Sequence, residues 1–168
     1  EFLIKANYNP FLLKSDQVII DFLTDSGTSA MSSNQWAALM RGDESYAGAR
    51  SWDRFEKQIL DLTGMTYILP THQGRAAERI LYSHIGGKGK YFISNTHFDT
   101  TRANIEYSGA IAIDIPAQEG KNYNSTFPFK GNIDLEKLQN IINLYGEVNI
   151  AAVILTVTNN SGGGQPVS

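Results

Sequence analysis

The sequence predicts an α/β protein whose mostly parallel sheet is flanked by helices. From residue 66 onward, short segments typical of strands alternate with amphipathic segments typical of helices. The connections between them are short, as in βαβ units. The almost continuous apolar run at residues 150–157 is typical of a central parallel strand covered on both faces. With 42% hydrophobic and 18% charged residues, the 168-residue chain can also form a sizeable core.

The first third of the chain contains one predicted strand and two predicted helices. Residues 17–24 are rich in β-branched and aromatic side chains, which favours a strand. Ser32 or Ser33 can cap a helix that reaches about Met40. A second helix is expected over residues 51–62, because apolar side chains recur there at positions i, i+4 and i+7.

The alternation that follows supplies the rest of the predicted sheet. Strands are expected at residues 66–69, 90–94, 110–115 and 150–157. Helices are expected at residues 73–85, at residues 100–107 and after a capping Asp134. Four apolar residues of the first of these helices should face the core: Ala76, Ala77, Ile80 and Leu81. The polar stretch 117–131 is interpreted as an exposed excursion.

Composition excludes several classes of protein. The net charge is −3 and the basic residues are scattered, so neither nucleic acid nor a membrane surface is an expected partner. The absence of cysteine excludes disulfides, zinc–thiolate sites and thiol nucleophiles, and is consistent with a cytoplasmic location. The sequence begins without methionine and ends just after an apolar run and a glycine cluster, so we expect a piece of a longer protein.

Ligands of open α/β sheets bind beyond the carboxyl ends of the strands, so the segments just after the strands are of most interest. Residues 70–75 join a predicted strand to a predicted helix. A helix start offers free N–H groups to an anion, Gly74 permits close approach, and Arg75 adds a forked cation. A phosphate site and an ordinary capped helix with a surface arginine are both open interpretations of this segment.

Three other segments carry polar or aromatic side chains that could serve a ligand. Phe98 could stack on a planar ligand and Asp99 could accept a hydrogen bond, although a core Phe98 and a helix-capping Asp99 are the commoner arrangement. Asn160, before three consecutive glycines, could bond a ligand oxygen or lie in a plain flexible loop. Tyr46, between small residues, could be a general acid or an ordinary exposed tyrosine.

Six ordered sequence blocks resemble the family of β-eliminating lyases, to which tryptophanase and tyrosine phenol-lyase belong. The blocks are LTDSGT (23–28), RGDESY (41–46), PTHQGR (70–75), FDTT (98–101), FKGNIDL (129–135) and GGQPVS (163–168). The resemblance extends over almost the whole chain from about Tyr8. It implies a pyridoxal 5'-phosphate (PLP) enzyme of fold type I, with an N-terminal arm over residues 1–35. Residues 36–168 would then be the first part of the large PLP-binding domain.

The resemblance also implies a role for each matching residue. Those expected to hold PLP are Gln73, Gly74 and Arg75 at the phosphate, Phe98 stacked on the pyridine ring, and Asn160 at the phenolic oxygen. Those expected near the substrate are Thr24, Ser26 and Asn160 at its carboxylate and Tyr46 as proton donor to the leaving group. The carbonyl of Gly27 and the side chain of Glu44 would contribute to a potassium ion site. The full-length enzyme would be a homotetramer acting on a small amino acid.

Within the family, the sequence favours a tryptophan-cleaving enzyme over a tyrosine-cleaving one. Asp99 follows the stacking phenylalanine where phenol-lyases carry threonine, and a carboxylate suits the indole N–H, which is only a donor. Arg50 and Ser51 are also similar to tryptophanase. The features that resemble phenol-lyase instead are Phe11–Leu13, residues 86–90 and Arg102.

The family requires a lysine that bonds covalently to PLP. None of the eight lysines lies in the family's lysine motif, so we expect that lysine beyond Ser168 and expect this chain alone to be inactive. An alternative from another class is a non-enzymatic phosphate- or nucleotide-binding α/β module, which would need the loop at residues 73–75 but neither Tyr46 nor Asn160.

Overall fold

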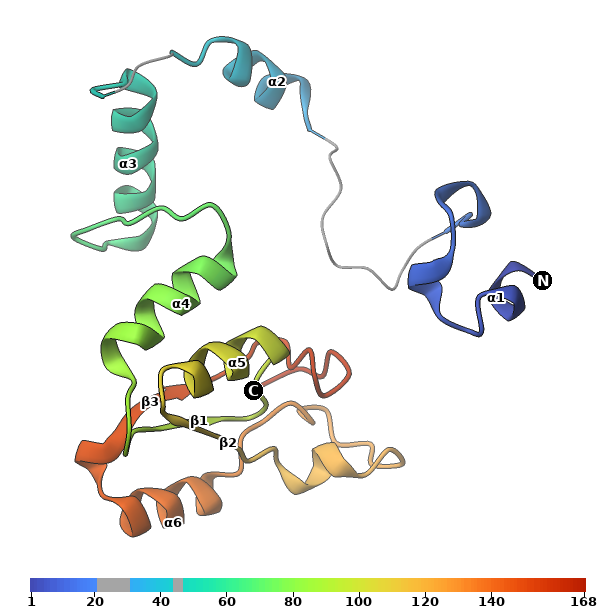
Figure 1. Ribbon diagram of the computed structural model, residues 1–168, viewed down its shortest axis with the longest axis vertical. Helices are drawn as coiled ribbons and strands as arrows, with labels where there is room; N and C mark the ends of the chain where they lie inside the picture. The colour runs from blue at the N-terminus through green and yellow to red at the C-terminus, as the bar shows by residue number, and fades with distance from the viewer. Residues whose placement is uncertain (21–30, 44–46) are drawn as a thin grey trace. The chain divides into compact units, whose positions relative to one another are not determined.

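A computed structural model describes residues 1–20, 31–43 and 47–168 (Figure 1). The chain divides into two compact units, Glu1–Ile68 and Leu69–Ser168. The boundary predicted at residue 35 stays a prediction.

The described part of the first unit is helical. Its elements are α1 (Phe2–Lys5), η1 (Pro10–Leu12), η2 (Ser15–Gln17), α2 (Ser33–Met40) and α3 (Arg50–Thr63). The strand predicted at residues 17–24 is wrong over its described part, because residue 17 ends the 3-10 turn η2 and residues 18–20 are irregular. Gln17 closes that turn, since its side-chain oxygen accepts the N–H of Lys14 at 3.0 Å. Residues 21–24 lie outside the described residues.

Both helices predicted for the first unit are confirmed, with their expected ends. Ser32 caps α2, where its hydroxyl accepts the N–H of Gln35 at 3.1 Å and the Gln35 side chain accepts the N–H of Ser32 at 2.7 Å. Gly64 ends α3 in the left-handed conformation with φ +68°, which residues with a side chain rarely adopt.

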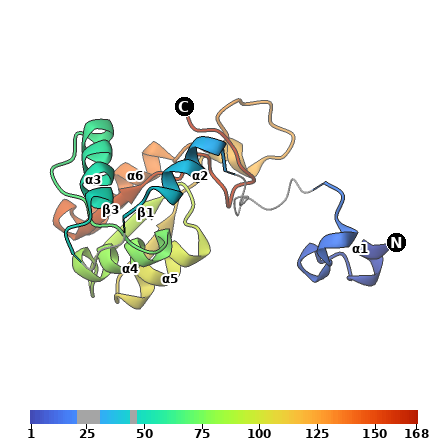
Figure 2. The ribbon, with the colours of Figure 1, turned by 90° about the horizontal axis from the view of Figure 1, so that it is seen from above.

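The second unit contains a parallel sheet with helices on both faces, as the sequence predicts. The strands are β1 (Tyr91–Ser94), β2 (Ile111–Asp114) and β3 (Ile150–Ile154), in the order β2-β1-β3. The main helices are α4 (Gly74–Ile85), α5 (Asp99–Tyr107) and α6 (Leu135–Tyr145), with 3-10 turns η3 (Gln118–Lys121) and η4 (Glu147–Asn149). Figures 1 and 2 show α4 beside α5, with α5 and α6 on opposite faces of the sheet.

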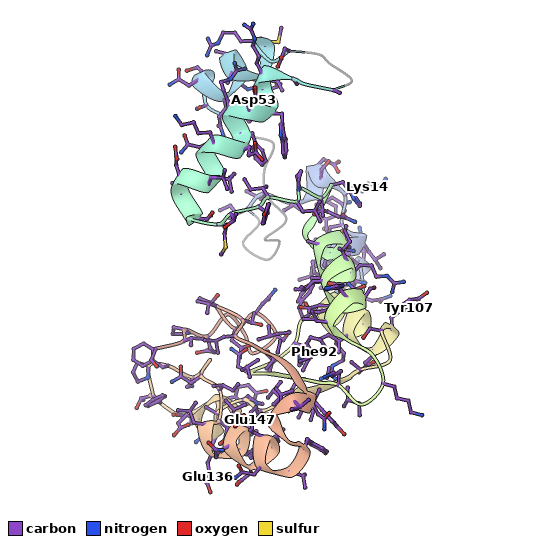
Figure 3. All side chains as sticks on the ribbon, turned by 90° about the vertical axis from the view of Figure 1, so that its left-hand side faces the viewer. Lys14, Asp53, Phe92, Tyr107, Glu136 and Glu147 are labelled. Carbon is purple, nitrogen blue, oxygen red and sulfur yellow. The ribbon has the colours of Figure 1, made fainter. Side chains whose placement is uncertain are left out.

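The core of the second unit lies between the sheet and the helices α4 and α5. Phe92 and Ile105 are fully buried. The Tyr82 ring meets the Phe92 ring edge to face, with centroids 5.2 Å apart. Figure 3 shows Phe92 inside this unit, whereas Glu136 and Glu147 are at its surface.

Three details of residues 66–168 differ from the predictions. β1 is the central strand of the described sheet, whereas β3 pairs with β1 alone and leaves Val153 47% exposed. Residues 66–69 form no strand, because they pair with no described strand. On α4, Tyr82 reaches the core, whereas Ala77, Ile80 and Leu81 are exposed and Ala76 is half-buried.

The apolar residues of α4 that do not reach the core line a groove on the outer side of this helix. Ile80 and Leu81 are about half exposed, at 51% and 50%. Together with Leu69 and His84 they border a groove of about 450 Å³, which contains none of the residues predicted to bind PLP. No helix in the described part of the chain combines the length and apolar character needed to cross a membrane.

Candidate functional site

The carboxyl edge of the parallel sheet brings together segments far apart in the sequence. Ser94 at the end of β1 is in register with Asp114 in β2 and with Ile154 in β3. The loops that leave β1 and β3 therefore begin side by side, at the edge where ligands of such sheets bind.

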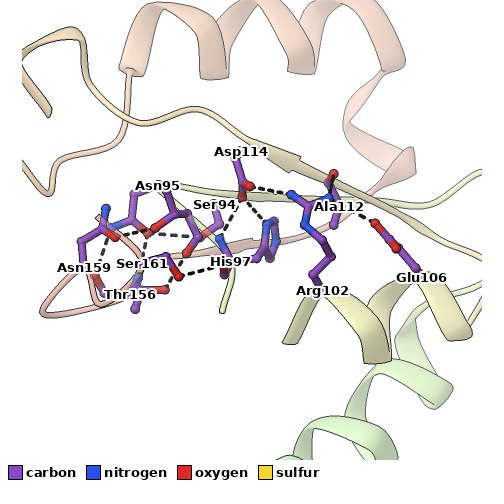
Figure 4. A network of polar contacts seen from close by, with 11 residues as sticks. Ser94, Asn95, His97, Arg102, Glu106, Ala112, Asp114, Thr156, Asn159 and Ser161 are labelled. Carbon is purple, nitrogen blue, oxygen red and sulfur yellow. Dashed lines mark hydrogen bonds and ion pairs between the residues drawn. The ribbon is translucent and has the colours of Figure 1, made fainter. Parts of the chain in front are cut away.

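The loop after β1 is fastened by a buried asparagine. Asn95 is fully buried, and its side-chain amide donates to the carbonyl oxygens of Gly131 at 2.8 Å and Thr156 at 3.0 Å. Its side-chain oxygen accepts the N–H of Thr156 at 2.9 Å (Figure 4). Every strong hydrogen-bonding position of this amide is thus occupied, so the residue holds the loop in one place.

Further hydrogen bonds join the loop after β1 to the loop after β3. The hydroxyl of Thr96 donates to the side chain of Asn159, which is 1% exposed. The hydroxyl of Ser161 donates to the carbonyl oxygen of His97 at 3.2 Å. Phe98 and Asn160, both predicted to bind PLP, are thus the sequence neighbours of two residues in direct contact.

The first two turns of α4 pack against α5, the helix that follows the loop after β1. Asn104 donates from its side chain to the carbonyl oxygen of Arg75 at 3.3 Å, and the hydroxyl of Thr101 donates to the carboxylate of Glu78. The predicted phosphate residues Gln73, Gly74 and Arg75 therefore lie beside α5, the helix that begins directly after Phe98.

The first turn of α4 has the properties that an anion requires. Gln73 precedes the helix in an extended conformation, and its side chain accepts no N–H of the first turn. A side-chain carbon placed at Gly74 would meet no atom within 4 Å, so the space in front of this turn is open. Gln73, Gly74 and Arg75 are all exposed. Unpaired N–H groups, the helix dipole and the guanidinium of Arg75 can act together on a phosphate group.

Phe98 and Asp99 adopt arrangements that differ from the commoner ones considered above. Phe98 is 40% exposed rather than part of the core, so one face of its ring is available to a ligand. Phe98 also occupies the capping position, whereas Asp99 is the first residue of α5 and accepts the N–H of Thr100 through Oδ1. The second carboxylate oxygen of Asp99 has capacity for a donor from a ligand.

The structure reveals a polar network that sequence reasoning did not single out. Nδ1 of the buried His97 lies 2.6 Å from Oδ1 of Asp114, which also accepts the His97 backbone N–H at 2.8 Å (Figure 4). Arg102 donates to the other oxygen of Asp114 and to the carbonyl oxygen of Ala112. Arg102, a feature that resembles phenol-lyase, thus ties α5 to β2. The sequence feature that could have revealed this network is the predicted parallel pairing of β1 and β2, which brings Asp114 beside the end of β1.

The charges within this network follow from burial and hydrogen bonding. Burial lowers the pKa of His97 below its usual 6.5, and Asp114 only partly offsets that effect. Burial acts to raise the pKa of Asp114, but hydrogen bonds from His97 and Arg102 outweigh it and lower the pKa. At neutral pH the imidazole is therefore neutral and the carboxylate is ionised. Because a carboxylate only accepts, Nδ1 of His97 carries the proton.

The lowered pKa of His97 predicts a loss of stability in mild acid. As pH falls below about 6.5, the unfolded chain takes up a proton at His97 that the folded chain still excludes. The free energy of unfolding should therefore fall from pH 6.5 down to the lowered pKa of His97. We expect urea unfolding at pH 7.5 and 5.5 to show a larger loss for the natural protein than for His97→Asn, which lacks this titration. Equal losses would contradict the assignment.

Five of the predicted site residues lie outside the described residues: Thr24, Ser26, Gly27, Glu44 and Tyr46. Asp43, which precedes Glu44 in the sequence, accepts the hydroxyl of Ser51 and the N–H groups of Ser51 at 2.9 Å and Arg50 at 2.7 Å, and these hydrogen bonds lower its pKa to about 2. Across residues 1–20, 31–43 and 47–168, no three His, Cys, Asp or Glu side chains form a cluster that could hold a metal ion.

The second unit is thus an α/β unit with an open helix start and an exposed aromatic side chain, two features suited to a phosphate-bearing ligand. The model of the family "Beta-eliminating lyase" matches residues 21–168. The chain therefore belongs to the β-eliminating lyases, a fold-type I PLP family, as its sequence blocks predict.

Curated relatives carry names from both branches of this family. The chain is 57% identical to "Tryptophanase" from Rhodobacter capsulatus and 58% identical to "Tryptophanase" from Hyphomonas neptunium, each over 97% of the chain and 36% of the relative. It is 48% identical to "Tyrosine phenol-lyase" from Pasteurella multocida over 99% of the chain and 36% of that relative. The chain thus spans about a third of the length of these curated relatives.

Proposed function

We propose that the protein is a PLP-dependent carbon–carbon lyase that cleaves L-tryptophan to indole, pyruvate and ammonia. The observation that carries the proposal is the open start of α4, which packs through Arg75 and Glu78 against α5, the helix that begins directly after Phe98. Membership of the β-eliminating lyases and the greater identity to relatives named tryptophanase support the same reaction.

The described residues fit PLP in shape and charge. The phosphate would bind the first N–H groups of α4 and the guanidinium of Arg75, where the open space at Gly74 permits close approach. Phe98 would stack on the ring, and Asn160, which is exposed, would bond the phenolic oxygen. When bound, PLP supplies an electron sink for the carbon from which the amino acid loses its proton.

The residues outside the described ranges complete the proposed site. Thr24 and Ser26 would lie near the substrate carboxylate, and Tyr46 would protonate the leaving group. Gly27 and Glu44 would bind a monovalent cation such as potassium. We further propose that the full-length protein is a cytoplasmic homotetramer.

The activity assay that tests this function uses the full-length protein loaded with PLP. We expect equimolar indole and pyruvate from tryptophan, at a higher kcat/KM than for phenol from tyrosine. Faster release of phenol would favour the second candidate, tyrosine phenol-lyase, which is supported by relatives of that name at 48–49% identity. The relatives are named as lyases, which argues against a non-enzymatic phosphate-binding module. If the full-length protein did not bind PLP at all, that alternative would be favoured.

The preference for tryptophan should depend on Asp99. In Asp99→Thr the acceptor for the indole N–H becomes a weaker, neutral one, so kcat/KM for tryptophan should fall about tenfold. Pyruvate release from β-chloroalanine, which has no indole, should stay within about twofold and serves as the matched control. An unchanged rate of tryptophan cleavage would refute the role of Asp99.

A further inference from the structure

Two neighbouring residues in the loop after β1 have opposite environments. The side chain of His97 is fully buried, with 0% exposure, while the ring of Phe98 is 40% exposed. The residue that would contact the cofactor therefore follows directly on a residue locked inside the sheet edge. This arrangement raises the question of what fixes the Phe98 ring in position.

His97 is held from two directions, through its side chain and through its backbone. Its N–H and its Nδ1 both reach Oδ1 of Asp114, at 2.8 and 2.6 Å, so one carboxylate oxygen fixes both the peptide and the ring. Its carbonyl oxygen accepts the hydroxyl of Ser161 at 3.2 Å. The peptide between His97 and Phe98 is therefore fastened to β2 on one side and to the loop after β3 on the other.

The second ring nitrogen of His97, Nε2, allows a role in holding the loop to be distinguished from a role in proton transfer. Among the described residues, Nε2 of His97 is a buried side-chain atom without a hydrogen-bond partner. A role in proton transfer would require Nε2, whereas holding the loop requires only Nδ1. The two roles can therefore be told apart by removing one nitrogen at a time.

We propose that His97 is a positioning residue, which sets the place and tilt of the Phe98 ring through its Nδ1–H bond to Asp114 and its carbonyl bond to Ser161. The inference rests on the proposed function, because it takes Phe98 as the residue that stacks on the PLP ring. Through Ser161 the same contact also fixes the neighbouring Asn160. His97 would thus hold the Phe98 ring and the Asn160 side chain in fixed positions relative to each other.

The test compares two substitutions at His97 in the full-length protein. Asn carries a side-chain amide where His carries Nδ1, so His97→Asn can still donate to Asp114. His97→Leu fills similar space with no donor. We expect His97→Leu to weaken PLP binding about tenfold and to shrink the visible circular dichroism band of the bound cofactor. His97→Asn should stay within about twofold of the natural protein in both.

Two further variants keep the test decisive if His97→Leu folds poorly. Ser161→Ala removes only the bond to the His97 carbonyl, and should weaken PLP binding about threefold with the same change in circular dichroism. Glu106→Gln alters the exposed end of the network and should change neither quantity.

Each outcome bears on one hypothesis. Equal losses in His97→Asn and His97→Leu, or no loss in His97→Leu and Ser161→Ala, would overturn the positioning role. A natural protein that binds no PLP would instead refute the proposed function.

Discussion

Replacing Arg75 by alanine should weaken PLP binding by the full-length protein about 10- to 100-fold. Arg75 lies exposed in the first turn of α4, directly after Gly74, and its backbone carbonyl rather than its guanidinium is engaged by Asn104. A hydrogen bond between two charged groups contributes about 1.5–3 kcal/mol. Each 1.4 kcal/mol corresponds to about a factor of ten in affinity. Titration of the apoprotein with PLP, followed by its visible absorbance, measures the effect.

Comparison with pyridoxal, which has no phosphate group, makes the test specific for the proposed contact. Arg75→Ala should leave pyridoxal binding within about twofold, and Arg75→Lys should give an intermediate loss of PLP binding, because lysine keeps the charge but not the fork. Arg79 is the matched control. It lies one turn further along α4, with its guanidinium 3.5 Å from the centre of the Tyr107 ring. Equal losses for Arg75→Ala and Arg79→Ala would refute a phosphate site at the helix start.

The sequence predicts the elements of the second unit well where local signals are strong. Asp134 accepts the N–H of Lys137 at 3.0 Å and caps α6 as expected. The helix expected at residues 51–62 is α3, which Gly64 ends in a left-handed turn. These features depend on a few neighbouring residues, so spacing alone reveals them.

The errors arise where the outcome depends on distant partners. The run at residues 150–157 has the composition of a central strand. Whether a strand is central depends on its neighbours in the sheet, and in this structure β1 is the strand with a neighbour on each side. On α4, alanine and leucine spacing suggested the wrong face, because the Tyr82 ring packs against Phe92 and turns that face toward the sheet. Neither fact is contained in the local sequence.

The candidate site shows the same division. The start of α4 at residues 73–75 was predictable, because a helix start is a local structure, and anion binding there stays a prediction. The contact of His97 with Asp114 spans 17 residues and arises only when β1 and β2 pair in parallel. The six sequence blocks supplied roles for Phe98 and Asn160, while the hydrogen bonds that bring their loops together required the structure.

Replacing Phe92 by alanine should lower the free energy of unfolding by about 3–5 kcal/mol, the usual cost of deleting a fully buried phenylalanine ring. Phe92 is 0% exposed, at the middle of the central strand β1, in edge-to-face contact with Tyr82. Its removal would leave a cavity between the sheet and α4, the helix whose first turn would hold the phosphate. Urea unfolding of the protein measures the loss.

The matched control is Tyr123→Ala, which removes an aromatic ring of similar size that is 97% exposed in the same unit. Its effect should stay within about 0.5 kcal/mol, because the ring buries almost no surface. If Phe92→Ala also weakens PLP binding at temperatures where it remains folded, α4 depends on the core for its place at the sheet edge. An effect on stability no larger than that of Tyr123→Ala would show that Phe92 is not at the centre of the core.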